Sequence, residues 1–215
     1  MQLIWRLILN TYDNAYTVKL HTNGRYSCGN NAMVKEDMFV YTGGHRVRGK
    51  ETGTVRILEP MNSTLNYFEY KIISRGAECE IGIGVGEADY PLDRMPGWNQ
   101  NGVGYHADDG HLYYQRGYGR AFGPLCTVGD RMGCGIDFAS EDSMGNIKVF
   151  FTKNGKQVGD LVRIKKPPTG LYPLVGMCSK GEQVQYLGHW HRLPQDSKQQ
   201  TTSSNGELLH RVAGS

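Results

Sequence analysis

The stretch Pro96–Tyr114, PGWNQNGVGYHADDGHLYY, decides how this chain folds. Pro96-Gly97 forces a turn, because proline fixes φ and glycine reaches positive φ without strain. Asp109-Gly110 has the composition of a tight chain reversal, in which Asp tolerates and Gly favours the left-handed region. The residues before and after this reversal are β-prone. The stretch therefore predicts a turn, a strand, a second turn and a second strand.

The second turn gathers polar side chains that support two interpretations. His106, Asp108, Asp109 and His111 lie within six positions, which would suit a metal or acid/base site. Calcium loops, however, need more oxygen ligands at alternating positions, and zinc sites usually draw ligands from separate elements. We therefore predict a structural turn whose carboxylates accept backbone N–H groups, and no metal site or cofactor.

The composition favours a β-rich chain with many turns. The 215 residues include 29 Gly and 13 Tyr, with few long apolar runs. Lys and Arg number 24 against 21 Asp and Glu, and no basic face is concentrated in the sequence, so nucleic acid is not expected as a ligand. No segment is long and apolar enough to cross a bilayer, so no membrane role is predicted.

The five cysteines indicate reduced thiols and not a disulfide framework. They form no Cys-x-x-Cys pair and leave an odd residue over, a pattern typical of cytoplasmic or nuclear proteins. Cys134 lies between two glycines in a β-prone segment, and we expect it to serve as a small core hydrophobe. No feature of the sequence indicates the depressed pKa and partner His that a catalytic thiol needs.

Alternating apolar residues predict the individual strands. In residues 66–73, Phe68, Tyr70 and Ile72 share one face and Glu69 and Lys71 the other, the pattern of a half-buried antiparallel strand. Asn154-Gly155 supplies a two-residue hairpin turn.

The segment EIGIGVG at residues 80–86 has an unusual second face. Its Ile and Val residues point inward, which leaves a side-chain-free glycine face on which we expect the ring of Trp98 or Tyr105 to lie. A phosphate-binding glycine loop is excluded because no helix follows. About a dozen short strands without an amphipathic helix predict an all-β chain with little or no helix, an antiparallel β-sandwich of two packed sheets.

Five motifs occur in one order along the chain. They are NYFEYKI at residues 66–72, PGW and GYHADDG within residues 96–110, GDRMGCGIDF at 129–138, FFTKNGKQVG at 150–159 and LYPLVGMCSKGEQV at 171–184. Together they resemble the SPRY domain family, although Tyr186-Leu187-Gly188 stands where the family often has Asn-Phe-Gly. The matched structural positions are Trp98, Tyr105, His106, Asp108, Asp109, Gly110, Cys134, Asn154 and Gly155. The resemblance implies a concanavalin-like sandwich, in agreement with the strand pattern.

The resemblance also divides the chain. Residues 37–192 would form the SPRY domain, and residues 1–36 an N-terminal extension that either adds strands to the sandwich or pairs with another chain. Residues 193–215 are polar, and we expect a disordered tail.

In function, the SPRY resemblance implies a non-catalytic module that binds a protein or short peptide through loops at one end of the sandwich. The same resemblance is compatible with a role as a scaffold or substrate-recognition subunit, including one associated with a ubiquitin ligase. From loop position and residue type we predict the ligand-binding residues Arg46, Arg48, Tyr90, Met95, Tyr118 and Lys180.

A carbohydrate-binding, lectin-like sandwich is the alternative. It would need paired carboxylates or a metal-organised sugar site. Asp108 and Asp109 are adjacent and would face opposite ways along a strand, which weakens this interpretation.

Overall fold

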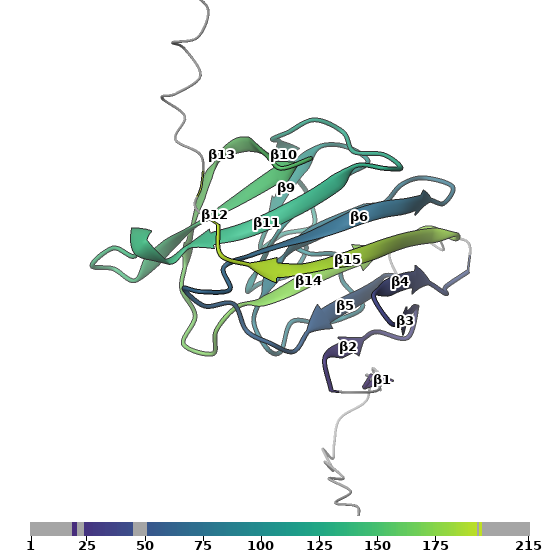
Figure 1. The fold of residues 1–215 in the computed structure, drawn as a ribbon, viewed down its shortest axis with the longest axis horizontal. Helices are drawn as coiled ribbons and strands as arrows, with labels where there is room; N and C mark the ends of the chain where they lie inside the picture. Colours follow the sequence, from purple (N-terminus) through teal and green to yellow (C-terminus); the bar gives the residue numbers. More distant parts are fainter. Residues whose placement is uncertain (1–18, 21–23, 45–50, 193, 195–215) are drawn as a thin grey trace, which may run out of the picture.

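The computed structural model describes residues 19–20, 24–44, 51–192 and 194, and within them two antiparallel β-sheets with almost no helix (Figure 1). Among these residues a single 3₁₀ turn, η1 (Phe138–Ser140), follows strand β11 (Arg131–Asp137). This confirms the all-β sandwich that the alternating sequence pattern predicts.

The first sheet has eight strands within the described residues. In spatial order they are β1 (Lys19–Leu20), β2 (Tyr26–Cys28), β5 (Gly53–Ile57), β14 (Tyr172–Met177), β7 (Ile81–Gly86), β8 (Gly102–His106), β9 (His111–Tyr114) and β10 (Arg120–Ala121). All neighbouring pairs are antiparallel.

The second sheet has seven strands in the part of the chain that the structure describes. In spatial order they are β13 (Lys156–Lys165), β12 (Asn146–Lys153), β11 (Arg131–Asp137), β6 (Tyr67–Arg75), β15 (Glu182–Trp190), β4 (Met38–Tyr41) and β3 (Ala32–Lys35). Its neighbouring pairs are antiparallel as well, with register shifts in the β6–β15 pair and in the β12–β13 pair.

Aromatic rings from both sheets meet in the core. Tyr26 of β2 contacts Phe39 of β4 edge-on, with ring centroids 5.2 Å apart. Tyr105 of β8 contacts Phe151 of β12, with centroids 5.9 Å apart. Cys134 of β11 is fully buried among these side chains. Packing of the inward rows against each other removes this apolar surface from water and holds the two layers together.

Part of the segment that the sequence assigned to an N-terminal extension lies in the sheets. β2 joins the eight-stranded sheet beside β5, and β3 joins the seven-stranded sheet beside β4. Residues 1–18 and 195–215 lie outside the described residues, so the predicted domain boundaries and the predicted tail stay predictions.

The strand order sorts the connecting loops onto two ends of the sandwich. We call one the pocket end; it carries the connections at residues 58–66, 87–101, 115–119, 138–145 and 166–171. The opposite end carries residues 42–44 and 51–52 and the connections at residues 76–80, 107–110, 122–130, 154–155 and 178–181.

Candidate functional site

The loop between β7 and β8 folds back over the glycine face of the eight-stranded sheet. Tyr90 lies on two of these glycines: a Cβ atom added to Gly102 would be 2.3 Å from the Tyr90 ring, and one added to Gly86 would be 2.9 Å from it. The His106 ring lies beside Gly82 in the same way. The rings on the glycine face are thus those of Tyr90 and His106, and our expectation of Trp98 or Tyr105 was wrong.

Tyr105 points the other way, into the core. It is fully buried, packs on Phe122 and Phe151, and donates its hydroxyl to the carbonyl of Pro124. Successive side chains of β8 point to opposite faces. Tyr105, which follows Gly104, therefore lies on the inward face and not on the glycine face.

Tyr90 and Met95 are inside the folded loop and not on its surface. Their exposed fractions are 2% and 1%. The Tyr90 hydroxyl donates to the Met95 carbonyl at 2.6 Å and accepts the Asn99 N–H at 3.1 Å, so it ties the loop to itself. From loop position the sequence predicts both side chains as exposed ligand-binding residues. The structure corrects this position, because the glycine face offers them a surface on which to pack.

The Asp109-Gly110 turn is a structural one in the described chain. Asp109 accepts the backbone N–H of His111 at 2.9 Å and the Tyr113 hydroxyl at 2.7 Å, and Gly110 has φ of +67°. Burial, followed by the charge of Asp109, raises the pKa of Asp108 to about 6. No group of three or more His, Cys, Asp or Glu side chains suited to a metal ion occurs among the described residues.

The His106 side chain packs beside this turn. Its ring is buried, stacks on Tyr113 with centroids 4.1 Å apart, and has Nε2 2.9 Å from the Pro96 carbonyl. Burial lowers the pKa of His106 to about 4, so the ring is neutral at pH 7 and Nε2–H donates to the carbonyl. Trp98, half-buried, packs on both rings.

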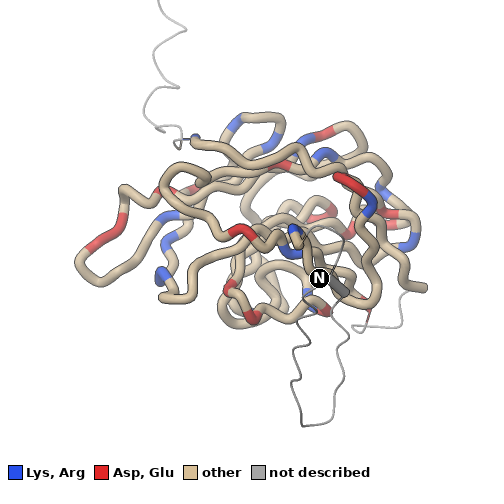
Figure 2. Tube along the Cα trace, turned by 60° about the horizontal axis from the view of Figure 1, so that its bottom comes forward, with Lys and Arg blue, Asp and Glu red and all other residues tan. Residues whose placement is uncertain are grey.

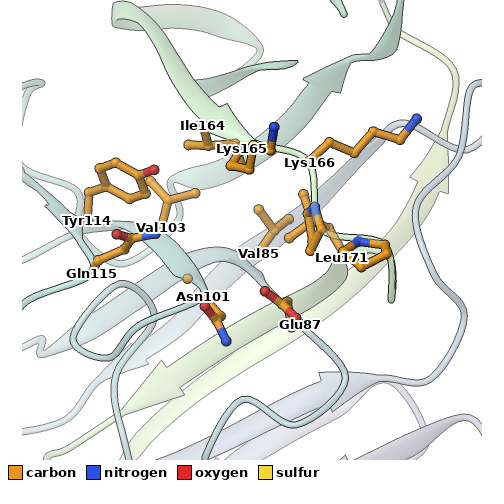
Figure 3. A pocket seen from close by; sticks show the side chains of 13 residues that line it. Val85, Glu87, Asn101, Val103, Tyr114, Gln115, Ile164, Lys165, Lys166 and Leu171 are labelled. Carbon is orange, nitrogen blue, oxygen red and sulfur yellow. The ribbon is translucent and has the colours of Figure 1, made fainter. Parts of the chain in front are cut away.

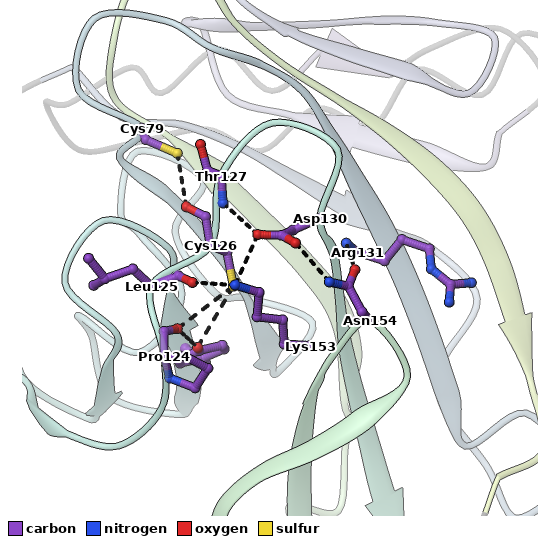
Figure 4. Close-up of polar contacts among 10 residues, drawn as sticks. Cys79, Pro124, Leu125, Cys126, Thr127, Asp130, Arg131, Lys153 and Asn154 are labelled. Atoms are coloured by element: carbon purple, nitrogen blue, oxygen red, sulfur yellow. Dashed lines mark hydrogen bonds and ion pairs between the residues drawn. The ribbon is translucent and has the colours of Figure 1, made fainter.

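Two further motif positions have structural surroundings. Asn154 and Gly155 form the β12–β13 turn with φ of +51° and +79°. The Asn154 side chain accepts the Arg131 N–H at 2.8 Å and donates to Asp130 at 2.7 Å (Figure 4). Burial raises the pKa of the Cys134 thiol far above its usual value, which keeps it protonated.

The remaining predicted ligand residues are separated by the fold. Tyr118 is 66% exposed and lies in the β9–β10 connection at the pocket end, where Arg116 packs over its ring. Lys180 is exposed at the opposite end. Arg46 and Arg48 fall outside the described residues. The predicted residues therefore do not form one cluster in the described part of the chain.

A pocket of about 220 Å³ opens at the pocket end, between the two sheets (Figure 3). Its apolar lining comes from Val85, Val103, Ile164 and Leu171, and its polar lining from Glu87, Asn101, Tyr114, Gln115, Lys165 and Lys166. Pro167 and Pro168 form part of the wall where the chain passes from β13 to β14. The pocket joins apolar surface from β7 and β8 of one sheet to β13 of the other.

Ion pairs hold the cationic side of the pocket. Lys166 contacts Glu141 with Nζ and Oε2 2.7 Å apart, and Arg163 contacts Asp142. Hydrogen bonds from Asn146 hold the pKa of Asp142 at about 2. Lys165 donates to the carbonyl of Met144, whose own side chain is 68% exposed. Figure 2 shows basic and acidic residues interspersed along the described part of the trace.

Sequence reasoning did not find this pocket. From the sequence we predict a solvated basic linker over Val162–Pro168, and this was wrong for residues 162–165, which belong to β13. The pocket depends on β13 lying opposite β7 and β8, which are far away in the sequence.

The family of this chain is shown by its similarity to known proteins. A family model described as "SPRY domain" matches residues 66–188. The chain belongs to the SPRY domain family. SPRY domain-containing protein 3 from Homo sapiens is 46% identical over 134 residues, which cover 62% of this chain and 30% of that protein. Ran-binding protein 10 from Danio rerio is 36% identical over 154 residues, 71% of this chain and 24% of that protein.

Solved SPRY structures agree with the fold. A human SPRY domain crystal structure has a TM-score of 0.67 at 41% identity and covers 73% of this chain and 94% of its own. The SPRY domain of human HERC1 has a TM-score of 0.58 at 18% identity, with coverage of 80% and 98%, and supports the fold alone. The matched part of this chain spans less than a third of the length of SPRY domain-containing protein 3 and of Ran-binding protein 10.

Two further observations concern the predicted reduced thiols and the membrane. None of the five cysteines forms a disulfide. Within the described ranges, no helix of this SPRY domain has the length and apolar character needed to cross a membrane.

Proposed function

We propose that this SPRY domain is a non-catalytic protein-interaction module that binds a short segment of a partner at the pocket end. The single observation that carries the proposal is the pocket, with apolar surface from both sheets and polar groups at its rim. The relatives named Ran-binding proteins are named for binding Ran, which supports a binding role and not a reaction. The comparisons give no support to the carbohydrate-binding alternative.

The size of the pocket suits one anchoring side chain. Pockets that enclose drug-sized ligands have volumes of about 300–1,000 Å³, whereas this one measures about 220 Å³. An apolar side chain of a partner can fill such a space while its backbone remains outside. Gln115 and Asn101 at the rim then offer amide groups to that backbone.

The exposed residues around the pocket extend the contact. Tyr118 lies three positions after Gln115. Met144 lies in the loop whose carbonyl accepts a hydrogen bond from Lys165. Tyr and Met are residue types that bury much area in interfaces. Because Lys165 and Lys166 are already engaged by Met144 and Glu141, we expect apolar contact to contribute more than charge to binding at this end.

The test compares partners retained from cells by the wild type and three variants with unchanged melting temperatures. Lys165→Trp places a ring across the mouth of the pocket, and Tyr118→Ala removes the exposed ring. Lys180→Glu is the control at the opposite end. Affinity purification with mass spectrometry identifies the partners, and titration of a purified partner measures the Kd.

We expect Lys165→Trp to abolish specific binding and Tyr118→Ala to raise the Kd by about tenfold, as truncation of an interface tyrosine commonly does. Lys180→Glu should retain the partners. Loss in Lys180→Glu alone would place the ligand at the opposite end, and binding unaffected by both pocket-end variants would refute the proposed site.

A further inference from the structure

The outer face of the seven-stranded sheet carries two neighbouring rows of side chains near the end opposite the pocket. We call them the apolar row and the basic row. The apolar row contains Met33, Val40, Ile73 and Val128, and the basic row contains Lys35, Lys71 and Arg131. Neither row belongs to the pocket or to the turn around Asp109.

The strand register aligns the basic row across five strands. Lys35 of β3 pairs with Met38 of β4, which pairs with Gln185 of β15. Gln185 pairs in turn with Lys71 of β6, and Lys71 with Arg131 of β11. Residues in register on one face are neighbours about 4.8 Å apart from strand to strand, so the row is about 19 Å long.

The apolar row runs beside it, two residues further along each strand. Met33 pairs with Val40, and Val40 with Gln183. Gln183 pairs with Ser74 and Val184 with Ile72, so Ile73, two positions beyond Lys71, is the extra residue of a bulge in β6. Two residues on a strand span about 6.6 Å, which is the separation of the two rows.

Val128 continues the apolar row beyond the sheet. Its loop follows β6, because Gly129 donates to the Ile72 carbonyl and Ile72 donates to the Asp130 carbonyl, both at 2.9 Å. This pairing places Val128 next to Ile73. Met33, Ile73 and Val128 are all exposed large apolar side chains, whereas the inward neighbours Val34, Ile72 and Met132 are buried.

The loop that carries Val128 is held firmly. Asp130 accepts hydrogen bonds from the Thr127 N–H at 2.9 Å and from the Asn154 amide at 2.7 Å. It also forms an ion pair with Lys153 at 3.1 Å (Figure 4). Lys153 also donates to the carbonyl of Leu125 at 2.7 Å. A surface that is already ordered loses little conformational entropy when a partner binds.

The charge of this surface is positive and largely uncompensated. Lys35, Lys71 and the nearby Arg75 have no ion-pair partner among the residues that the structure describes. Arg131 pairs with Glu69, which lies beneath it and is only 2% exposed. Glu36 and Asp37 follow Lys35 in the turn at one edge of the surface and are the acidic residues in the β3–β4 connection.

We infer that the two rows form a second docking surface, whose partner is an acidic segment with apolar side chains. Its carboxylates would meet the basic row and its apolar side chains the apolar row. A second copy of this chain is a poor occupant, since it would bring the same cations against themselves. With the pocket at the other end, such a surface lets the chain hold two partners at once.

The test uses fluorescein-labelled peptides of about 16 residues, which as helices are about 24 Å long and cover the rows. One amphipathic peptide is made of Glu and Leu. A second replaces Glu by Lys, and a third replaces Leu by Ser. Fluorescence anisotropy gives the Kd for the whole chain at low and moderate salt, and sedimentation reports self-association.

The central variant is Lys35→Glu/Lys71→Glu, and Ile73→Ser tests the apolar row. Lys148→Glu/Arg120→Glu is the matched control, because it changes the net charge equally at exposed basic residues away from the two rows, with Arg120 on β10 of the other sheet. Lys165→Trp closes the pocket and separates this surface from the proposed peptide site.

The wild type should bind the Glu/Leu peptide, more tightly at low salt, and neither of the other two. Lys35→Glu/Lys71→Glu should raise the Kd at least tenfold and Ile73→Ser several-fold, with both control variants unchanged. Equal weakening in the matched control, absence of saturable binding, loss only in Lys165→Trp, or occupation of the rows by a second copy would each overturn the inference.

Discussion

At the scale of single residues, glycines on the central strands decide what can lie on the sheet faces. Gly84 of β7 has the carbonyl of Val103 only 2.0 Å from the position of a Cβ atom, and Gly86 and Gly102 together leave room for the Tyr90 ring. These glycines are required by close approach of backbone and ring, although the sequence shows only their spacing.

We therefore expect Gly84→Ala to lower the free energy of unfolding by about 3 kcal/mol or more, since the added methyl group meets backbone that cannot move aside. Gly117→Ala is the matched control, because no atom lies within 4 Å of its Cβ position. Urea unfolding of both variants measures the difference, and equal stability would contradict the close approach.

His106 makes stability depend on pH in a defined direction. Burial lowers its pKa from 6.5 to about 4, so below pH 6.5 the unfolded chain takes up a proton that the folded chain refuses. Folding stability from this residue is therefore lost as the pH falls from about 6.5 to about 4, by up to about 3 kcal/mol.

The measurement is urea unfolding of the wild type and of His106→Gln between pH 4 and pH 7. Gln can still donate to the Pro96 carbonyl but does not titrate, so the stability gap between the two proteins should shrink as the pH falls. A gap that stays constant over this range would show that His106 is protonated alike in both states.

At the scale of elements, short turns hold the loops that the proposed surfaces use. The β12–β13 turn connects to the loop before β11 through Asn154, whose amide contacts Asp130 while its carbonyl oxygen accepts the Arg131 N–H. One side chain thus links a hairpin to the loop that carries Val128.

Replacing Asn154 by Ala should cost about 1–2 kcal/mol of stability, because both hydrogen bonds are lost and Ala must adopt φ of +51°. The exposed neighbour Lys156, changed to Ala, should have little effect. Thermal unfolding compares the two, and hydrogen exchange at Thr127 and Arg131 should rise in the Asn154 variant alone. Unchanged protection there would argue against the link.

At the scale of the whole molecule, the strand order separates the binding features. Tyr118 and the pocket lie at one end, Lys180 lies at the other, and the two rows lie on the outer face of one sheet. A module with separated surfaces can bring two proteins together without any catalytic group, which is how we interpret this SPRY domain.

The sequence by itself determined the strand alternation, the Asn154-Gly155 turn, the structural nature of the Asp109 turn and the family. These depend on residue spacing and on backbone preferences that act over a few positions. The burial of Tyr90, Met95 and Glu69, the rings on the glycine face and the pocket between β7, β8 and β13 were decided by the tertiary structure. Each of them requires segments distant in the sequence to meet, and a local pattern carries no information on which strands become neighbours.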